Sequence, residues 1–199
     1  VMKYVQEKLG LDLDIDKTFR LVLFSGLKKN YVGFEGDNYI IKGMVAKKSN
    51  TPEFIKMETM EVMKILGSIK SPDEIEKSLD MLRDKVQEIY NKLRKKEYTL
   101  DQLAISVMLS KDPKEYKKNT PQHVKAALLL MNEGITVTKG DIISFVKTKD
   151  KVGVKPVRLA KLSDVDTSKY LEYVRSAFEQ FLLAFGVQWD ELAGVRRLL

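Results

Sequence analysis

Two consecutive apolar stripes with helical spacing do most to constrain the fold of this chain. The first stripe runs from Phe54 to Leu66 and ends at Gly67, and the second runs from Ile75 to Leu93. Apolar side chains that recur every three or four residues give a helix one face to bury. Only a short connection separates the two stripes. We therefore predict two long helices that pack antiparallel against each other.

Helix start signals lie next to these stripes and beyond them. Thr51 precedes a proline, and threonine can cap a helix whose first turn contains proline. Ser71 and Glu74 have the spacing of a capping box, and so do Thr99 and Gln102. We predict side-chain caps at all three positions.

The first 48 residues have a β-rich pattern behind a short helix. Met2–Leu9 reads as the end of a helix, closed by Gly10. The segments 11–15 and 18–24 read as strands, and 31–41 reads as a hairpin with its turn near Gly36.

The region after residue 98 mixes both patterns. It contains predicted strands at 104–109 and 142–146, and predicted helices at 121–131, 168–185 and 189–199. The aromatic stripe of the helix at 168–185 is expected to be core rather than a stacking surface for bases. Together these patterns predict an α+β fold dominated by helices, with a small β-containing subdomain.

The net charge of +7 is unevenly distributed. Residues 1–56 carry +3 and residues 101–161 carry +6, whereas residues 57–100 are neutral and residues 162–199 carry −2. Two separated basic blocks suit two patches that meet one polyanion, and a generally basic surface is the plainer alternative. The chain contains no cysteine, which excludes disulfides and thiolate metal sites and fits a cytoplasmic protein.

Basic residues gather where the β-rich part meets the helices. Lysine can neutralise phosphates, and a tyrosine hydroxyl can bond a phosphate oxygen. The candidate DNA-binding residues here are Lys28, Lys29, Tyr31, Lys42, Gly43, Lys47, Lys48, Ser49 and Asn50. The alternative interpretation of the first pair is the solvated end of a strand.

This order of residues resembles the end of the palm and the start of the thumb in family B DNA polymerases, the archaeal ones in particular. The family's elements here are Lys-Lys-x-Tyr, Lys/Arg-Gly and a basic pair. Further short motifs follow in the family's order, and they are Leu103-Ala104-Ile105, Tyr116-Lys117, Pro121-Gln122-His123-Val124, Gly134, Gly140-Asp141-Ile142-Ile143 and Phe185-Gly186. Each motif is short, but the ordered set covers nearly the whole chain.

The resemblance implies roles for several residues. Lys29 would reach the minor groove near the primer terminus, and Tyr31 would bond a primer phosphate. Because minor-groove acceptors are similar for all correct base pairs, such a lysine can sense pair geometry without reading sequence. Lys117 and Lys118 would touch the backbone further along the duplex. His123 would face the backbone from a helix start, and a capping or packing role is its alternative.

This chain also departs from the family pattern. Lys47, Lys48 and Ser49 stand where relatives commonly have Arg-Arg-Asp, so any contact that needs the guanidinium fork is in question. Asn30 occupies a position that is often basic, and Gln122 is inserted into the Pro-His-Val element.

The family's metal-binding motifs, Asp-x-x-Ser-Leu-Tyr and Tyr-Gly-Asp-Thr-Asp, are absent, as are its fingers lysine and exonuclease carboxylates. We therefore expect no catalytic residue, no bound cofactor and no metal ligand in this chain, with Mg²⁺ in the missing palm portion. Asp12, Asp14 and Asp16 alternate as on one strand face, which we interpret as solvated because the spacing fails the EF-hand pattern.

The resemblance assigns residues 1–48 to the palm and residues 49–199 to the thumb. The expected partners are primer–template double-stranded DNA and the remaining palm, fingers and exonuclease domains, with a sliding clamp as a further candidate and no membrane. A start at Val1 fits a piece of a longer chain, and abundant Lys and Glu without Cys favour a thermophile. Two alternatives remain: a separate non-catalytic subunit of a split polymerase, and a stand-alone basic DNA-binding protein.

Overall fold

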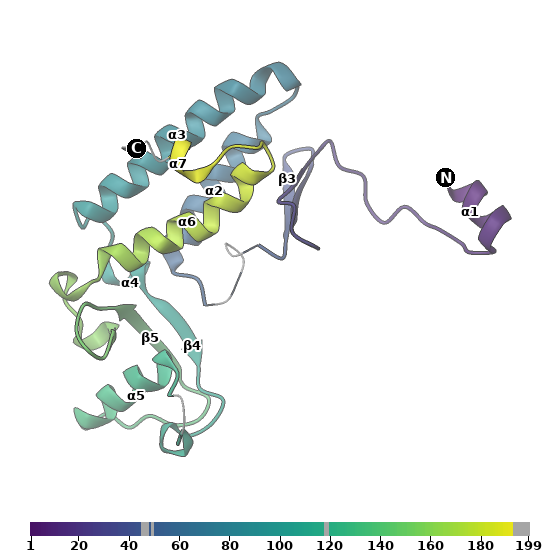
Figure 1. The fold of residues 1–199 in the computed structure, drawn as a ribbon. Coiled ribbons are helices and arrows are strands. Elements are labelled where there is room, and N and C mark those ends of the chain that lie inside the picture. Colours follow the sequence, from purple (N-terminus) through teal and green to yellow (C-terminus); the bar gives the residue numbers. More distant parts are fainter. Residues whose placement is uncertain (45–47, 49, 118–119, 193–199) are drawn as a thin grey trace.

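The computed structural model describes residues 1–44, 48, 50–117 and 120–192, with side chains as far as 190. Figure 1 shows a helical body with one small sheet beside its upper part and a second small sheet below it. The N-terminal helix α1 (Met2–Leu9) lies at the end of an extended arm that leaves the body. The mixture of helices and two antiparallel sheets confirms the predicted α+β class.

The first sheet is a three-stranded antiparallel meander in the order β1-β2-β3. Its strands are β1 (Leu21–Phe24), β2 (Tyr31–Glu35) and β3 (Asn38–Lys42). The predicted hairpin is therefore confirmed. The predicted strand at 11–15 is wrong, because that segment has no strand partner among the described residues and each of its residues is exposed. Asp12, Asp14 and Asp16 lie exposed on this irregular segment rather than on a strand face.

The helical body buries the apolar stripes against the first sheet and against one another. Its helices are α2 (Glu53–Gly67), α3 (Ile75–Arg94), α6 (Thr167–Leu183) and α7 (Trp189–Leu192). Side chains from both the sheet and the helices share one core, which includes Leu23, Val32, Phe34, Phe54, Val62, Leu66, Val86, Ile89, Tyr170, Val174 and Phe178. The aromatic stripe of α6 is therefore core, as predicted. One continuous core also spans residues on both sides of position 48.

The three predicted caps have different outcomes. Thr99 and Gln102 form the capping box at the start of α4 (Leu100–Leu103), which confirms that prediction. The box at Ser71 is wrong, because a 3₁₀ turn precedes α3 and the Glu74 carboxylate instead accepts the backbone N–H of Lys70 at 2.7 Å. Pro52 rather than Thr51 occupies the N-cap position of α2.

The second sheet and one helix form the small subdomain. Its elements are β4 (Ile105–Met108), α5 (Gln122–Asn132), β5 (Ile142–Lys147) and β6 (Val154–Pro156), with 3₁₀ turns at Pro113–Glu115, Val157–Leu159 and Leu162–Asp164. The strands pair antiparallel in the order β4-β5-β6, and α5 packs against β5 and β6. A separate core, which includes Ile105, Val124 and Phe145, holds this subdomain together.

Arg20 links the first sheet to the end of α2. Its guanidinium donates hydrogen bonds to the carbonyl oxygens of Gly67, at 2.8 Å, and Ile69. Because the last carbonyls of a helix lack partners within the helix, the arginine satisfies groups that would otherwise need water. Among the residues described, no helix combines the length and the apolar character needed to cross a membrane.

Candidate nucleic-acid interface

Strand pairing gathers the first set of candidate residues at one edge of the first sheet. Phe24 pairs with Tyr31, and Tyr31 pairs with Lys42. The end of β1, the start of β2 and the end of β3 therefore lie side by side. Lys28 and Lys29 occupy the connection between the first two of these strand ends. We call Lys28, Lys29, Tyr31 and Lys42 the sheet-edge cluster.

Close packing fixes the backbone beneath this cluster. Gly43 has φ 69° and lies against Asn30, so that a Cβ at Gly43 would overlap the Asn30 side chain and lie 2.7 Å from the Lys29 carbonyl oxygen. Lys29 itself has φ 63°, a left-handed conformation that non-glycine residues adopt uncommonly. The glycine therefore permits the approach of two loops that together set the position of Lys29.

The cluster combines one anchored ring with free charges. The Tyr31 ring contacts Phe19 and Phe24, with centroids 6.2 and 6.0 Å apart, which leaves it half-buried. Lys28, Lys29 and Lys42 are exposed, and none of these lysines has an ion-pair partner in the described part of the chain. Their charge is therefore available to an external anion.

The basic pair at the start of the helical body is described only in part. Lys47 and Ser49 lie outside the described residues, so their predicted contacts stay predictions. Lys48 and Asn50 are exposed, and the Lys48 carbonyl accepts the backbone N–H of Thr51 at 3.2 Å. This turn leads directly into α2.

The small subdomain carries the second group of candidates. Lys117 is exposed, and Lys118 lies outside the described residues. His123, in the first turn of α5, meets the Tyr116 ring edge-on, with centroids 6.4 Å apart. Burial lowers the pKa of His123 below its usual value, which favours the neutral imidazole near pH 7.

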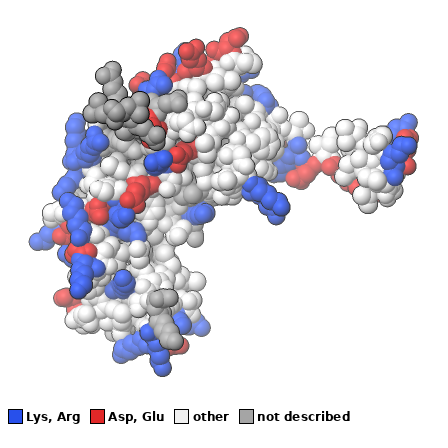
Figure 2. Space-filling view, in the orientation of Figure 1, with Lys and Arg blue, Asp and Glu red and all other residues white. Residues whose placement is uncertain are grey.

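Sequence patterns missed Lys111, whose ammonium lies 4.4 Å from the centroid of the Tyr116 ring. A cation over an aromatic face is attracted to the ring's negative centre. Figure 2 shows Lys and Arg side chains gathered over the lower end of the molecule, where the small subdomain lies, with few acidic side chains among them. This subdomain is therefore a second basic surface, separate from the sheet-edge cluster.

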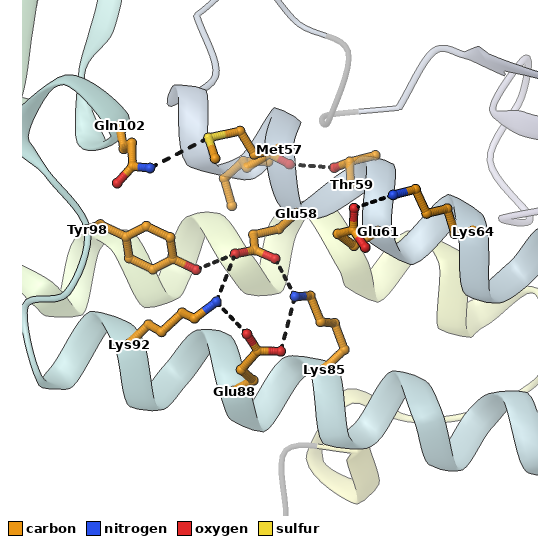
Figure 3. Close-up of polar contacts among 11 residues, drawn as sticks. Met57, Glu58, Thr59, Glu61, Lys64, Lys85, Glu88, Lys92, Tyr98 and Gln102 are labelled. Atoms are coloured by element: carbon orange, nitrogen blue, oxygen red, sulfur yellow. Dashed lines mark hydrogen bonds and ion pairs between the residues drawn. The ribbon is translucent and has the colours of Figure 1, made fainter.

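A polar network in the helical body is structural in character. Figure 3 shows Glu58 of α2 between Tyr98 and the lysines of α3. Its carboxylate accepts the Tyr98 hydroxyl at 2.6 Å and pairs with Lys85 at 2.8 Å. Glu88 bridges Lys85 and Lys92. The network joins two helices and a loop.

No three His, Asp or Glu side chains come together as a metal site within the ranges that the structure describes. The expectation that this chain holds no metal stays a prediction. Its physical basis is that divalent cations need several oxygen ligands at one point.

Comparison with known proteins identifies the family to which this chain is similar. The model of DNA polymerase family B matches residues 2–180. The chain is 60% identical to DNA polymerase 1 of Aeropyrum pernix over its full length and covers 21% of that protein. It is 53% identical to DNA polymerase 1 of Saccharolobus solfataricus, with 97% of this chain and 22% of that protein covered. The chain thus spans about a fifth of the length of these relatives.

The fold comparison agrees. The family B DNA polymerase from the hyperthermophilic archaeon Pyrobaculum calidifontis superposes with a TM-score of 0.65 at 27% identity, covering all of this chain and 24% of that one. The matched region includes the sheet-edge cluster, the small subdomain and the helical body as far as residue 180 in α6. On the sequence match and the fold together, this chain belongs to DNA polymerase family B.

Proposed function

We propose that this chain is the C-terminal palm and thumb part of a DNA-directed DNA polymerase, and that it grips the primer–template duplex in the cytoplasm. In this proposal residues 1–48 complete the palm and residues 49–199 form the thumb. The sheet-edge cluster carries the argument. Three exposed lysines, which have no ion-pair partner among the residues that the structure describes, surround an anchored tyrosine at a place fixed by tight loop packing.

The chemistry of the cluster fits a duplex held without sequence readout. Ammonium groups neutralise phosphates by charge alone, so the contact is the same for every base pair. Tyr31 keeps its ring against Phe19 and Phe24, which orders the side chain before DNA arrives. Lys29 is the residue we assign to the primer terminus, because the resemblance to family B polymerases gives that role to the second lysine of the Lys-Lys-x-Tyr element.

The second basic surface would contact the duplex at a second place along its length. Lys117 and the Lys111–Tyr116 pair would meet the backbone at a distance from the primer terminus. Because burial lowers the pKa of His123 and so favours its neutral form, its contribution would be a hydrogen bond rather than a full charge.

The N-terminal arm supports the assignment to a larger enzyme. It exposes the apolar side chains of Tyr4, Leu9, Leu11, Leu13 and Ile15. A run of uncovered apolar residues at one end of a chain calls for a partner surface. In this proposal the remaining palm provides it, together with the fingers and exonuclease domains.

Catalysis would take place in the rest of the enzyme. Because the family's two metal-binding motifs are absent from this sequence, we expect the Mg²⁺ ions to be held by the rest of the enzyme. The contribution of this chain would be positional: it would hold the primer 3′-hydroxyl in line with the incoming dNTP. We expect the isolated chain to be inactive.

The test compares two lysines in the intact polymerase. Lys29→Ala should slow single-nucleotide insertion by on the order of a hundredfold, because small misplacements of reacting groups are costly. Lys117→Ala should leave insertion nearly intact and shorten the product made per binding event. Lys77→Ala, an exposed lysine of α3, is the matched control and should affect neither. Equal effects of Lys29→Ala and Lys117→Ala would refute the assignment of Lys29 to the primer terminus.

The exposed arm also favours one alternative, a separate subunit of a split polymerase. Both readings predict that the chain binds the larger polymerase portion, whereas a stand-alone DNA-binding protein would not. Size-exclusion chromatography with and without that portion distinguishes these two readings from the stand-alone DNA-binding protein. Failure to co-elute would contradict both polymerase readings.

A further inference from the structure

A groove of about 330 Å³ lies where the start of α5 meets the end of β5 and the first turns of α6. The side chains that line it are Gln122, Lys147, Lys169, Glu172, Tyr173 and Ser176. Most of these residues can donate hydrogen bonds: two ammonium groups, two hydroxyls and one amide. Glu172 is the single carboxylate among them.

Lys147 is the unusual member. It is 9% exposed, and its main chain is held on both sides: the Tyr170 hydroxyl accepts its N–H at 3.0 Å, and its carbonyl accepts the N–H of Asp166 at 3.0 Å. Its ammonium donates to the side-chain oxygen of Gln122. The described residues give Lys147 no carboxylate partner. A buried ammonium that has only a neutral partner is poorly compensated.

The other charges of the groove do not compensate it. Lys169 and Glu172 pair with each other, with the ammonium 2.9 and 3.0 Å from the two carboxylate oxygens. Burial lowers the pKa of Lys147, and the nearby Lys169 charge lowers it further. An anion in the groove would oppose both effects, because its negative charge would favour the protonated form of Lys147.

We propose that this groove binds one phosphate group, with Lys147 as its main charge and Gln122 as the residue that positions the Lys147 ammonium. The phosphate can belong to a nucleic-acid backbone or be free in solution, since the donors recognise the same oxygen atoms. The groove is a site additional to the sheet-edge cluster. The proposal also assigns a positioning role to Gln122, the residue inserted into the family's Pro-His-Val element.

The experiment measures duplex affinity against salt concentration for the full chain and for Lys147→Met. Losing one phosphate contact should make the slope of log K against log salt less steep by about 0.9 and weaken binding roughly eightfold at 0.1 M salt. Lys77→Met removes the same charge from an exposed site on α3 and should change neither. Lys169→Met, at an exposed side chain, carries the same test if Lys147→Met fails to fold.

The melting temperature in inorganic phosphate, against sodium chloride of equal ionic strength, separates the two sources. A phosphate-dependent rise in wild type that is lost in Lys147→Met, with an unchanged duplex slope, would assign the groove to free phosphate. No change in either measurement relative to Lys77→Met would overturn the proposal. Lys29→Ala in the same salt series reports on the proposed duplex grip alone, so that either idea can fail without the other.

Discussion

The hydroxyl of Tyr98 should stabilise the helical body by a measurable amount. Tyr98 is 5% exposed, its ring lies 4.8 Å from that of Phe54, and its hydroxyl donates to Glu58 at 2.6 Å. Tyr98→Phe keeps the ring and removes only this bond. A hydrogen bond to a charged group contributes about 1.5–3 kcal/mol. For a chain of this length, about 2 kcal/mol corresponds to a fall in Tm of about 4–8 °C.

Removing the acceptor should cost more. Glu58→Ala leaves the Tyr98 hydroxyl without its partner and leaves Lys85, whose side chain is 14% exposed, with Glu88 alone. Breaking a buried pair on one side typically costs about 3–5 kcal/mol. The double variant should lose less than the sum of the two single changes, because both remove the same hydrogen bond.

The assay is urea denaturation followed by circular dichroism, combined into a double-mutant cycle. Glu61→Gln on the same helix is the control: its exposed pair with Lys64 should leave the midpoint unchanged. Additive losses at Glu58 and Tyr98, or a Tyr98→Phe midpoint equal to that of wild type, would refute the reasoning.

Three further changes test other parts of the fold. Tyr170→Phe removes the hydroxyl that bonds two buried main-chain groups and should cost about 2–4 kcal/mol in urea denaturation. Gly43→Ala should weaken duplex affinity more than Gly36→Ala, because both glycines have positive φ but a Cβ is obstructed only at Gly43. The hydrogen bond from Lys92 holds the pKa of Glu88 below its usual 4.5, so Glu88→Gln should lower stability at pH 7 and lose that effect as the pH falls below about 4.5.

Each of these has a contrary outcome. A Tyr170→Phe protein as stable as wild type would mean that water replaces the hydroxyl. Equal duplex affinities for the two glycine variants would show that backbone strain, and not loop contact, controls the lysines. A Glu88→Gln penalty that persists at pH 3 would show that packing rather than charge is responsible.

Local patterns predicted the elements whose signals lie close together in sequence. The hairpin at Tyr31–Glu35 and Asn38–Lys42 was predictable because its apolar and turn residues are adjacent, and the Thr99 box because both partners lie within one turn. The capping box predicted at Ser71 does not form, because the Glu74 carboxylate accepts the Lys70 N–H instead. The spacing of residues alone cannot show which of two donors a carboxylate will bond.

The candidate sites also differ in how far local sequence could reveal them. Lys29 and Tyr31 were named as candidates from sequence because they stand in one Lys-Lys-x-Tyr element, but their approach to Lys42 follows from strand register. Lys147 was not named as a candidate, since its hydrogen bond to Gln122, which lies 25 residues earlier, forms only in the tertiary fold. Charged residues of this kind resemble any surface lysine until the tertiary fold encloses them.

The bonds from Arg20 to the carbonyls of Gly67 and Ile69 also have a mechanical consequence. They fasten one end of α2 to the first sheet, while the other end of α2 contacts α4, which leads into the small subdomain. A rigid rod that is pinned at one end moves least there and most at its far end. Because the first sheet and the helical body share one core and the small subdomain has its own, any swing would displace the small subdomain farthest and leave the sheet-edge lysines nearly still.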